Sequence, residues 1–331
     1  MHYPRYFRRR GPRAWLLWPL SKLFCALVGL RRGLYRVGIL RTRRFPRPLI
    51  VVGNISVGGV GKTPFVIFLI EQLQQMGWRP GVVARGYRGE SDAWPLLVDA
   101  HGDARYSGDE PLLIARRGKV PVCVGPDRPA AVDHLLSRHP EVDVVISDDG
   151  LQHYRMGRDI ELAVVDAVRG LDNGFCLPAG PLREPKRRLE TVDAVFYNGN
   201  IARRRGMRLT VGGVARLDEP ETLSPLSQFA GERVHAVAGI GDPERFFRTL
   251  EAAGILVVRH PFPDHHAYRA GDLAFDPPLP ILMTEKDAVK CSGFGVDDLW
   301  QVRVDLQLNQ LAFIELRQLL RQGLKAWNGS G

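Results

Sequence analysis

A glycine-rich loop between an apolar run and an amphipathic stretch carries the clearest chemistry in the sequence. It follows the apolar run 48–52 and reads Ser56-Val57-Gly58-Gly59-Val60-Gly61-Lys62-Thr63. In a strand–loop–helix context, glycines let backbone N–H groups surround phosphate oxygens at the positive end of the helix. We therefore expect residues 56–63 to bind nucleotide phosphates, with Lys62 reaching the β- and γ-phosphates and Thr63 binding Mg²⁺. Ser56 departs from this pattern, because a glycine usually opens it.

A carboxylate for the metal is expected at the end of a neighbouring strand. The apolar run at residues 142–147 ends in Asp148 and Asp149. In phosphate-binding loops such a carboxylate holds Mg²⁺ directly or through water. Both aspartates are therefore candidate metal ligands.

The nucleotide is expected to be ATP. Guanine-specific sites use the pattern Asn-Lys-x-Asp, which is absent from this sequence. Residues 284–287 read Thr-Glu-Lys-Asp, in which the spacing from lysine to aspartate is wrong. The expected cofactors are ATP and Mg²⁺.

Four further polar patches combine charged side chains with turn-forming residues. They contain Asp109 (residues 107–111), His153 (148–153), Arg183 (177–185) and His265 (262–266). The first three patches flank expected strand ends, where ligands of parallel sheets bind.

Each of these residues also has a structural interpretation that the sequence leaves open. Asp109 would cap a helix that begins just before Pro111. Arg183 would pair with Glu184 or Asp172. His153 would close a turn, and His265 or His266 would lie in a surface loop.

Short apolar runs separated by amphipathic stretches must position these residues. The runs that read as strands are 48–52, 82–84, 120–124, 142–146, 162–165 and 194–196, with helices expected between them. This order predicts an α/β fold of the P-loop NTPase type, with a doubly wound, mainly parallel sheet. A further unit begins at residue 234, where Asp242-Pro243 signals a helix start.

Charge and periodicity set the N-terminal segment apart. Residues 1–47 hold thirteen Lys or Arg residues and no Asp or Glu, whereas the whole chain has a net charge of +10. Leucines at positions 16, 20, 23, 27, 30 and 34 share one helical face. A basic helix with one apolar face is typical of a helix in the plane of a membrane surface. A signal peptide, a spanning anchor and a helix packed on the protein's own core remain alternatives.

Leucines among the basic residues of the N-terminal segment disfavour nucleic acid as a partner.

The four cysteines form no Cys-x-x-Cys pair, so neither a disulfide framework nor a zinc site is expected, and a reducing compartment is favoured.

Taken together, these strings resemble the tetraacyldisaccharide 4'-kinase family of Gram-negative bacteria over essentially the whole chain. The matching strings are the basic N-terminal helix, Gly53-Asn54, the loop through Pro64, 85–87, 108–111, Asp127-Arg128, 148–153, 177–185, Asp264-His265 and 284–290. A serine at the first glycine position is usual in this family.

The resemblance implies a MgATP-dependent kinase at the cytoplasmic face of the bacterial inner membrane. It would phosphorylate the 4'-hydroxyl of an acylated glucosamine disaccharide 1-phosphate, giving lipid IVA in lipid A biosynthesis. By the family's pattern Asp109 aligns with the proposed base and His265 with its partner, and Asp148 aligns with the magnesium carboxylate.

The remaining site residues implied by the resemblance bind substrate or phosphate. We expect Asn54, Arg128, His153 and Arg183 to contact substrate, with Lys62 and Arg183 also acting in catalysis.

These expectations divide the chain into four segments. Residues 1–47 form a basic amphipathic membrane-associating helix and 48–199 a P-loop kinase core. Residues 200–231 form a linker or β insertion, and 232–331 a second, smaller α/β lobe that closes on the site. We expect a monomer. The alternatives are a membrane-associated P-loop ATPase or GTPase switch or assembly factor, and a module that only binds nucleotide.

Overall fold

The computed structural model describes residues 4–87 and 89–328, so the outermost residues of the expected segments 1–47 and 232–331 lie outside the described part. The strands are β1 (Leu49–Gly53), β2 (Pro80–Ala84), β3 (Leu96–Leu97), β4 (Val122–Val124), β5 (Val144–Ser147), β6 (Ile160–Asp166), β7 (Ala194–Asn198), β8 (Gly206–Arg216), β9 (Arg233–Ala238), β10 (Leu256–Pro261), β11 (Ile281–Thr284) and β12 (Leu299–Leu308). The α-helices are α1 (Pro12–Leu16), α2 (Trp18–Arg36), α3 (Lys62–Gln75), α4 (Ala104–Ser107), α5 (Asp109–Gly118), α6 (Arg128–Arg138), α7 (Pro243–Ala252), α8 (Glu285–Ala288) and α9 (Gln310–Asn328). Short 3-10 helices are η1 (Arg5–Phe7), η2 (Lys186–Glu190), η3 (Leu226–Phe229) and η4 (Ala270–Leu273).

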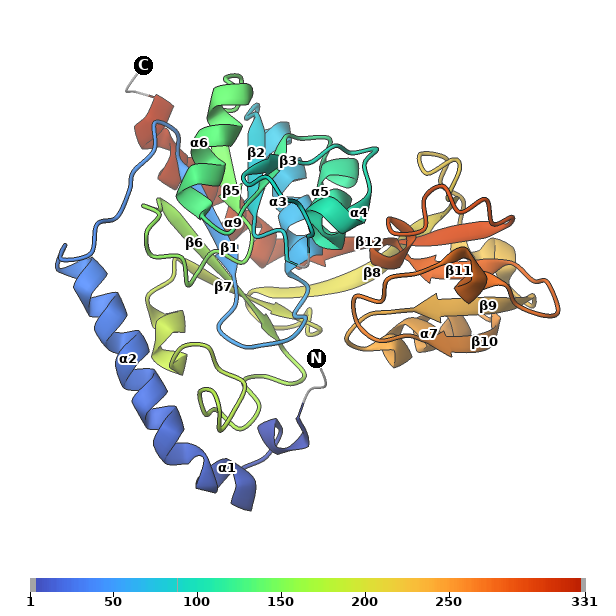
Figure 1. Cartoon of the computed structure of the whole chain (residues 1–331), viewed down its shortest axis with the longest axis horizontal. Helices are drawn as coiled ribbons and strands as arrows, with labels where there is room; N and C mark the ends of the chain where they lie inside the picture. Colours follow the sequence, from blue (N-terminus) through green and yellow to red (C-terminus); the bar gives the residue numbers. More distant parts are fainter. Residues whose placement is uncertain (1–3, 88, 329–331) are drawn as a thin grey trace.

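One sheet of twelve strands runs through the molecule (Figure 1). Its order is β10-β9-β11-β12-β8-β7-β6-β1-β5-β2-β4-β3. Neighbouring strands are parallel except for the pairs β3–β4 and β8–β12. The expected α/β fold with a mainly parallel sheet is therefore confirmed.

The first lobe has helices on both faces of its sheet. Along β1, Ile50 and Val52 join the core beneath α3, α5 and α9, whereas Leu49 and Val51 join the core beneath α6. All five residues of β1 are buried. A parallel strand covered on both faces needs apolar residues at successive positions, which explains the continuous apolar run in the sequence.

Two connections of the first lobe lack the helices expected between strands. Residues 148–159 join β5 to β6, and residues 167–193 join β6 to β7 with only the 3-10 helix η2. Asp149, Asp172 and Gly174 have positive φ angles of 49°, 51° and 73°. Backbone in the left-handed region interrupts a helix, so these segments form turns instead. They carry two of the expected site patches.

The second lobe is joined to the first by the antiparallel pair β8–β12. In β8, Met207 packs in the first-lobe core and Val214 in the second-lobe core. In β12, Leu306 packs in the first-lobe core and Val302 in the second-lobe core. The segment expected as a linker, 200–231, therefore contains a strand inside the sheet. Asp242 caps α7 as expected, accepting from the Arg245 N–H.

The C-terminal helix α9 was expected in the second lobe, and this expectation is wrong. Leu316, Leu320 and Leu324 pack in the first-lobe core together with β1 and α3. Gly323 lies against Ile160 of β6 so closely that an added Cβ would come within 2.7 Å of that side chain. The long strand β12 carries the chain back to the first lobe before α9 begins, which local periodicity does not reveal.

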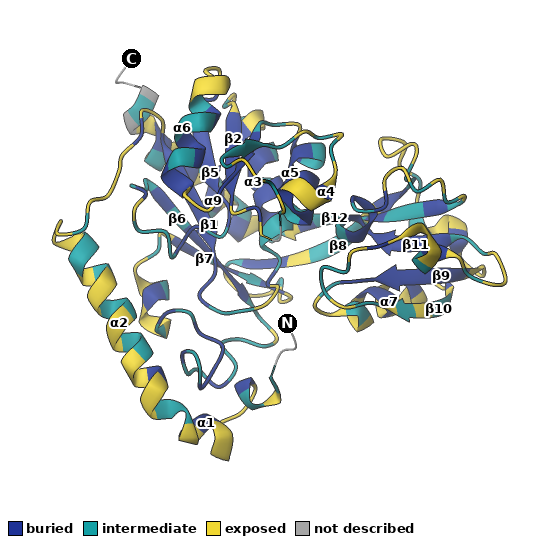
Figure 2. Ribbon diagram, in the orientation of Figure 1, coloured by how far each residue is buried: buried dark blue, intermediate teal, exposed yellow. Residues whose placement is uncertain are grey.

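The N-terminal helix α2 lies along the outside of the first lobe (Figure 1), and much of it is exposed (Figure 2). Leu20, Leu23, Leu27 and Leu30 are 55–61% exposed. The opposite face contacts the protein through Ser21 and Cys25, which bond to Cys176, and through Arg32, which bonds to Thr191. No helix in the described ranges is long and apolar enough to cross a bilayer.

Candidate active site

The glycine-rich loop has the backbone needed to surround phosphate groups. Gly58 and Gly61 have φ angles of 97° and 88°, and α3 begins directly after Gly61. A Cβ on Gly61 would lie 2.6 Å from Nδ2 of Asn198, whose amide donates to the Val60 carbonyl at 3.0 Å. Glycine is therefore required here, and the first N–H groups of α3 lie at the loop, as in phosphate-binding helices.

The segment 176–183 forms a wall beside this loop. Ser56 forms a β-bridge with Leu182, and the Val57 N–H donates to the Pro181 carbonyl at 2.9 Å. The Arg183 N–H donates to the Ile55 carbonyl at 2.7 Å. These bonds hold Arg183 next to the glycine-rich loop, although more than a hundred residues separate them in sequence.

Asn54 orients the loop lysine. The Lys62 ammonium lies 3.3 Å from the Asn54 Oδ1 atom, and the Asn54 amide donates to the Ser56 carbonyl at 2.8 Å. Asn54 is fully buried. Asn54 therefore supports the loop by holding Lys62, and its expected contact with substrate stays a prediction.

Asp148 and Asp149 differ sharply in their surroundings. Asp149 has a φ of 49°, accepts from Arg183 at 2.9 Å and lies 3.5 Å from the Lys62 ammonium. Partial burial acts to raise the pKa of Asp149, but Lys62 and Arg183 outweigh it and hold the pKa well below its usual value. Arg183 thus forms an ion pair with Asp149, a partner that the sequence interpretation, with Glu184 or Asp172, did not include.

Asp148 is buried and keeps a carboxylate oxygen that no protein group satisfies. Its Oδ1 atom has no hydrogen-bond partner among the described residues. Burial, followed by the negative charge of Glu110, raises the pKa of Asp148 to about 7. A buried carboxylate without a partner is costly unless a ligand completes it.

Arg128 and His153 lie beneath this loop. Arg128 is 1% exposed and donates to the Asp148 carbonyl at 3.0 Å, so it supports the segment that carries Asp148, and its expected contact with substrate stays a prediction. The His153 N–H donates to the Gly150 carbonyl at 2.9 Å, which closes a turn. Burial and the charge of Arg128 lower the pKa of His153 to about 4, so its imidazole is neutral at neutral pH.

Asp109 and His265 meet across the two lobes. The His265 Nδ1 atom lies 2.8 Å from the Asp109 Oδ2 atom, although 156 positions separate them in sequence. Asp109 is the first residue of α5, with Gly108 at the N-cap position and no side-chain cap, so the capping interpretation is wrong. His265 has a φ of 61°, a costly backbone conformation that tends to occur at functional sites.

The surroundings keep Asp109 ionised although it is buried. Burial acts to raise its pKa, but the hydrogen bond from His265 and the charge of Lys286 outweigh it and the net pKa is lowered. The surface-loop interpretation thus fails for His265. His266, in contrast, points away from Asp109 to a partly buried bond with Asp272 at 3.1 Å.

Lys286 is a site residue that the sequence reasoning missed. Its ammonium lies 3.1 Å from Glu110, 3.3 Å from Asp264 and 3.4 Å from the His265 Nε2 atom. An ammonium only donates, so His265 accepts at Nε2 and donates from Nδ1 to Asp109. The string 284–287 was noticed as a poor guanine motif and as part of the family resemblance, but no role was given to Lys286, and nothing local in the string indicates contact with α5.

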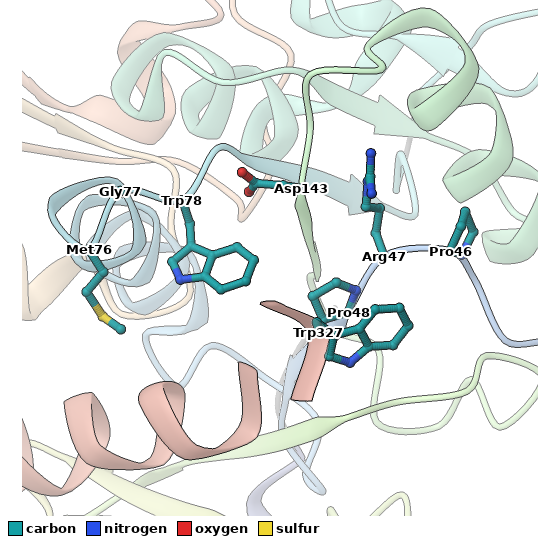
Figure 3. A pocket seen from close by; sticks show the side chains of 8 residues that line it. All are labelled: Pro46, Arg47, Pro48, Met76, Gly77, Trp78, Asp143 and Trp327. Carbon is teal, nitrogen blue, oxygen red and sulfur yellow. The ribbon is translucent and has the colours of Figure 1, made fainter. Parts of the chain in front are cut away.

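A pocket lies away from all of these side chains (Figure 3). Pro48, Trp78 and Asp143 line this cavity, and these residues precede β1, β2 and β5. The glycine-rich loop follows β1. This cavity is therefore at the amino edge of the sheet, opposite the candidate site.

Most of the chain matches the model of one protein family. The model described as tetraacyldisaccharide-1-P 4'-kinase (LpxK) matches residues 13–322. The chain belongs to this kinase family. Curated tetraacyldisaccharide 4'-kinases are 52% identical in Azoarcus sp. (strain BH72), over 97% of this chain and 96% of the relative, and 47% identical in Nitrosococcus oceani, over 97% and 95%.

A solved structure of the LpxK family has the same fold. LpxK from Aquifex aeolicus, crystallised in complex with ATP, superposes with a TM-score of 0.77 and 28% identity, covering 94% of this chain and 99% of that one. In this member of the kinase family, the candidate site residues form two clusters. The first is Asn54, Lys62, Asp148, Asp149 and Arg183 around the glycine-rich loop, and the second is Asp109, His265 and Lys286.

Proposed function

We propose that this kinase transfers the γ-phosphate of ATP to the 4'-hydroxyl of an acylated glucosamine disaccharide 1-phosphate, forming lipid IVA. The observation that carries the proposal is Asp109, a buried ionised carboxylate held by His265. Family membership supplies the substrate class. An alcohol is a weak nucleophile, so its phosphorylation calls for a positioned base.

The loop 56–63 would hold the triphosphate. Its N–H groups at the start of α3 would bind phosphate oxygens, and Lys62 would contact the outer phosphates. Asn54 would keep the Lys62 ammonium in place. Positioning and charge neutralisation account for most of the catalysis of phosphoryl transfer.

Thr63 and Asp148 fit a magnesium site. The unsatisfied Oδ1 atom of Asp148 is the donor type that Mg²⁺ prefers. The Asp149 Oδ1 atom also has no hydrogen-bond partner in the described part of the chain, but Arg183 and Lys62 already neutralise the charge of Asp149, so we assign the direct contact to Asp148. The described residues contain no cluster of three metal-ligating side chains, in keeping with a metal that one or two protein groups share with substrate phosphates. When bound, Mg²⁺ would neutralise charge on the β- and γ-phosphates.

Asp109 would accept the proton of the 4'-hydroxyl as the oxygen attacks the γ-phosphorus. Its Oδ2 atom is held by His265, and its Oδ1 atom accepts from the Glu110 N–H at 2.9 Å. His265, with its Nε2 atom facing Lys286, would orient the base and stabilise its charge. Arg183 would stabilise charge on the phosphoryl oxygens as it transfers.

The leucine face of α2 would bring the enzyme to its lipid substrate. Four exposed leucines on a helix with basic flanks match a helix that lies in a membrane surface. We place the enzyme at the cytoplasmic face of the bacterial inner membrane, as a monomer.

Transfer of label distinguishes a kinase from a nucleotide switch. The protein, incubated with Mg²⁺, γ-labelled ATP and the acylated disaccharide in mixed micelles, should move label into the lipid. The nearness of Asp109 to His265 favours the kinase over an ATPase switch, which needs a residue that orients water. Release of labelled phosphate alone, with none in lipid, would refute the proposal.

A further inference from the structure

Two cysteines stand together where the N-terminal helix meets the body of the protein. The Cys25 thiol of α2 donates to the Cys176 sulfur, with 2.7 Å between the two Sγ atoms. A disulfide bond is about 2.0 Å long, so bond formation requires the sulfurs to approach by less than about 1 Å. Sequence reasoning did not connect the pair, because 151 positions separate the two residues.

The geometry points to a redox modification site: we propose that Cys25 and Cys176 form a reversible disulfide that fastens α2 to the wall of the glycine-rich loop. This inference does not depend on the proposed function, because it concerns the thiols and not the acceptor. The other two cysteines are 0% and 1% exposed, and neither is hydrogen-bonded to another thiol among the described residues.

The two thiols have different accessibility. Cys25 is partly exposed, whereas Cys176 is 4% exposed. Burial and the bond from Cys25 raise the pKa of Cys176 well above its usual value. Cys25 is therefore the thiol that an oxidant reaches first, and Cys176 is the resolving thiol.

The oxidant we consider is a peroxide. The Cys25 thiolate attacks one peroxide oxygen, the O–O bond breaks, and Cys25 becomes a sulfenic acid while hydroxide leaves and is protonated to water. The Cys176 sulfur then attacks the Cys25 sulfur, the S–O bond breaks, and the departing oxygen takes the Cys176 proton as a second water. Two thiols and one peroxide thus give one disulfide and two waters, with two electrons passing to the peroxide.

Metal binding is the competing use of two adjacent thiols. A structural zinc site needs four ligands. The structure offers no group of three His, Cys, Asp or Glu side chains around a common point in its described ranges. The pair is therefore better suited to disulfide chemistry.

Cys176 connects α2 to the nucleotide-binding loop. The Ser21 hydroxyl donates to the Cys176 carbonyl at 2.8 Å. Cys176 forms a β-bridge with Leu182, which in turn forms a β-bridge with Ser56 of the loop. A disulfide at Cys25 would therefore make the contact between α2 and the loop wall permanent until a thiol reductant reverses it.

The experiment oxidises the full-length protein with a small excess of hydrogen peroxide, blocks remaining thiols and measures intact mass with peptide mapping. We expect two of the four cysteines to escape alkylation, a Cys25–Cys176 linked peptide, and full reversal by dithiothreitol. Hydrogen exchange of residues 18–36 should slow in the oxidised protein. Cys25→Ser, at the more exposed position, should abolish the protection from alkylation, the linked peptide and the slower hydrogen exchange.

Matched controls separate the pair from general thiol oxidation. Cys123→Ala and Cys291→Ala should leave the linked peptide and the slower exchange intact. Cys176→Ala should leave Cys25 as a stable sulfenic acid that a dimedone probe captures. Four alkylated cysteines after oxidation, or a linked peptide that survives Cys25→Ser, would overturn the proposal.

Discussion

Asp109 and Asp148 have different electrostatic surroundings in the candidate site. Asp109 faces His265 and the cations Lys286 and Lys290, which hold it ionised. Asp148 faces no cation closely enough to satisfy its Oδ1 atom. One carboxylate is thus suited to accept a proton and the other to accept a metal, and their environments divide the two tasks.

Replacement of Asp109 by asparagine tests the base directly. The change keeps the size of the side chain but removes its ability to take a proton, so kcat should fall by roughly 10²–10⁴-fold. ATP affinity, measured by calorimetry, should change little because Asp109 lies outside the glycine-rich loop. Asp92→Asn, at an exposed position, is the control. Near-normal kcat in Asp109→Asn would remove the assignment.

Lys286 should set the pH at which the base works. Its charge helps to lower the pKa of Asp109, so Lys286→Met should raise that pKa. The base must be ionised, and the acid limb of the kcat/KM profile should therefore move to higher pH. Lys286→Arg, which keeps the charge, should restore much of the original profile. An unchanged acid limb in Lys286→Met would show that the lysine does not act on the base.

At the residue scale, the sequence predicted the features that depend on residues close together in the chain. The loop 56–63 was foreseen because glycine positions and the following helix are local features. Asn198 beneath Gly61 and Lys286 beside Asp109 were not, because each contact joins segments more than a hundred positions apart. Asn54 and Arg128 were expected at the substrate, and the structure adds that both are buried and support the segments that carry Lys62 and Asp148.

At the scale of elements, α2 has one face that contacts the protein and an opposite face that is exposed. Its inward face is fixed by Ser21, Cys25 and Arg32, and its outward leucines have no cover in the described chain. Periodicity predicted the apolar stripe correctly. It could not decide whether the stripe faces the core, because both arrangements give the same spacing.

Charges placed on the outward face should weaken membrane binding. Leu23→Glu with Leu27→Glu should reduce sedimentation with anionic lipid vesicles, because apolar burial is lost and anionic lipid repels the new charges. Gly33→Glu is the matched control, since Gly33 is exposed and an added side chain meets nothing within 4 Å. Deletion of residues 1–40 should abolish binding. If the deleted protein still sediments with vesicles, α2 is not the anchor.

At the scale of the whole molecule, the two lobes are joined by buried charges as well as by the contact between Asp109 and His265. Arg117 of α5 bonds to Glu285 of α8 and to Asp305 of β12 at 2.6 and 2.7 Å. The Arg117 and Glu285 side chains are 11% and 7% exposed. The lobes are thus held together near Asp109 by a second set of bonds.

Removal of Arg117 should loosen this junction. Arg117→Met leaves Glu285 buried without its partner, at a cost of about 3–5 kcal/mol in unfolding free energy, which urea titration would measure. Arg117→Met with Glu285→Gln should recover part of that loss. The exposed pair Lys119–Glu221 provides the control, and Lys119→Met should cost at most about 1 kcal/mol. Equal losses in the two single variants would contradict the assigned role.

The path of the chain explains why the second lobe was delimited only in part. The sequence showed where a new α/β unit begins, near residue 234, because strand and cap signals are local. It did not show where the unit ends. The amphipathic pattern of α9 looks the same on either lobe, and only the pairing of β12 with β8 reveals which core receives it.

The antiparallel register of β8 with β12 makes the second lobe the loop of an oversized hairpin. Arg216 stands opposite Trp300 at the far end of the pair, so residues 217–299 leave and return at one place. Such an excursion can be lengthened, shortened or exchanged without rethreading the rest of the chain. His265 therefore lies on a single inserted excursion of the chain, whereas the glycine-rich loop and Asp109 lie outside it.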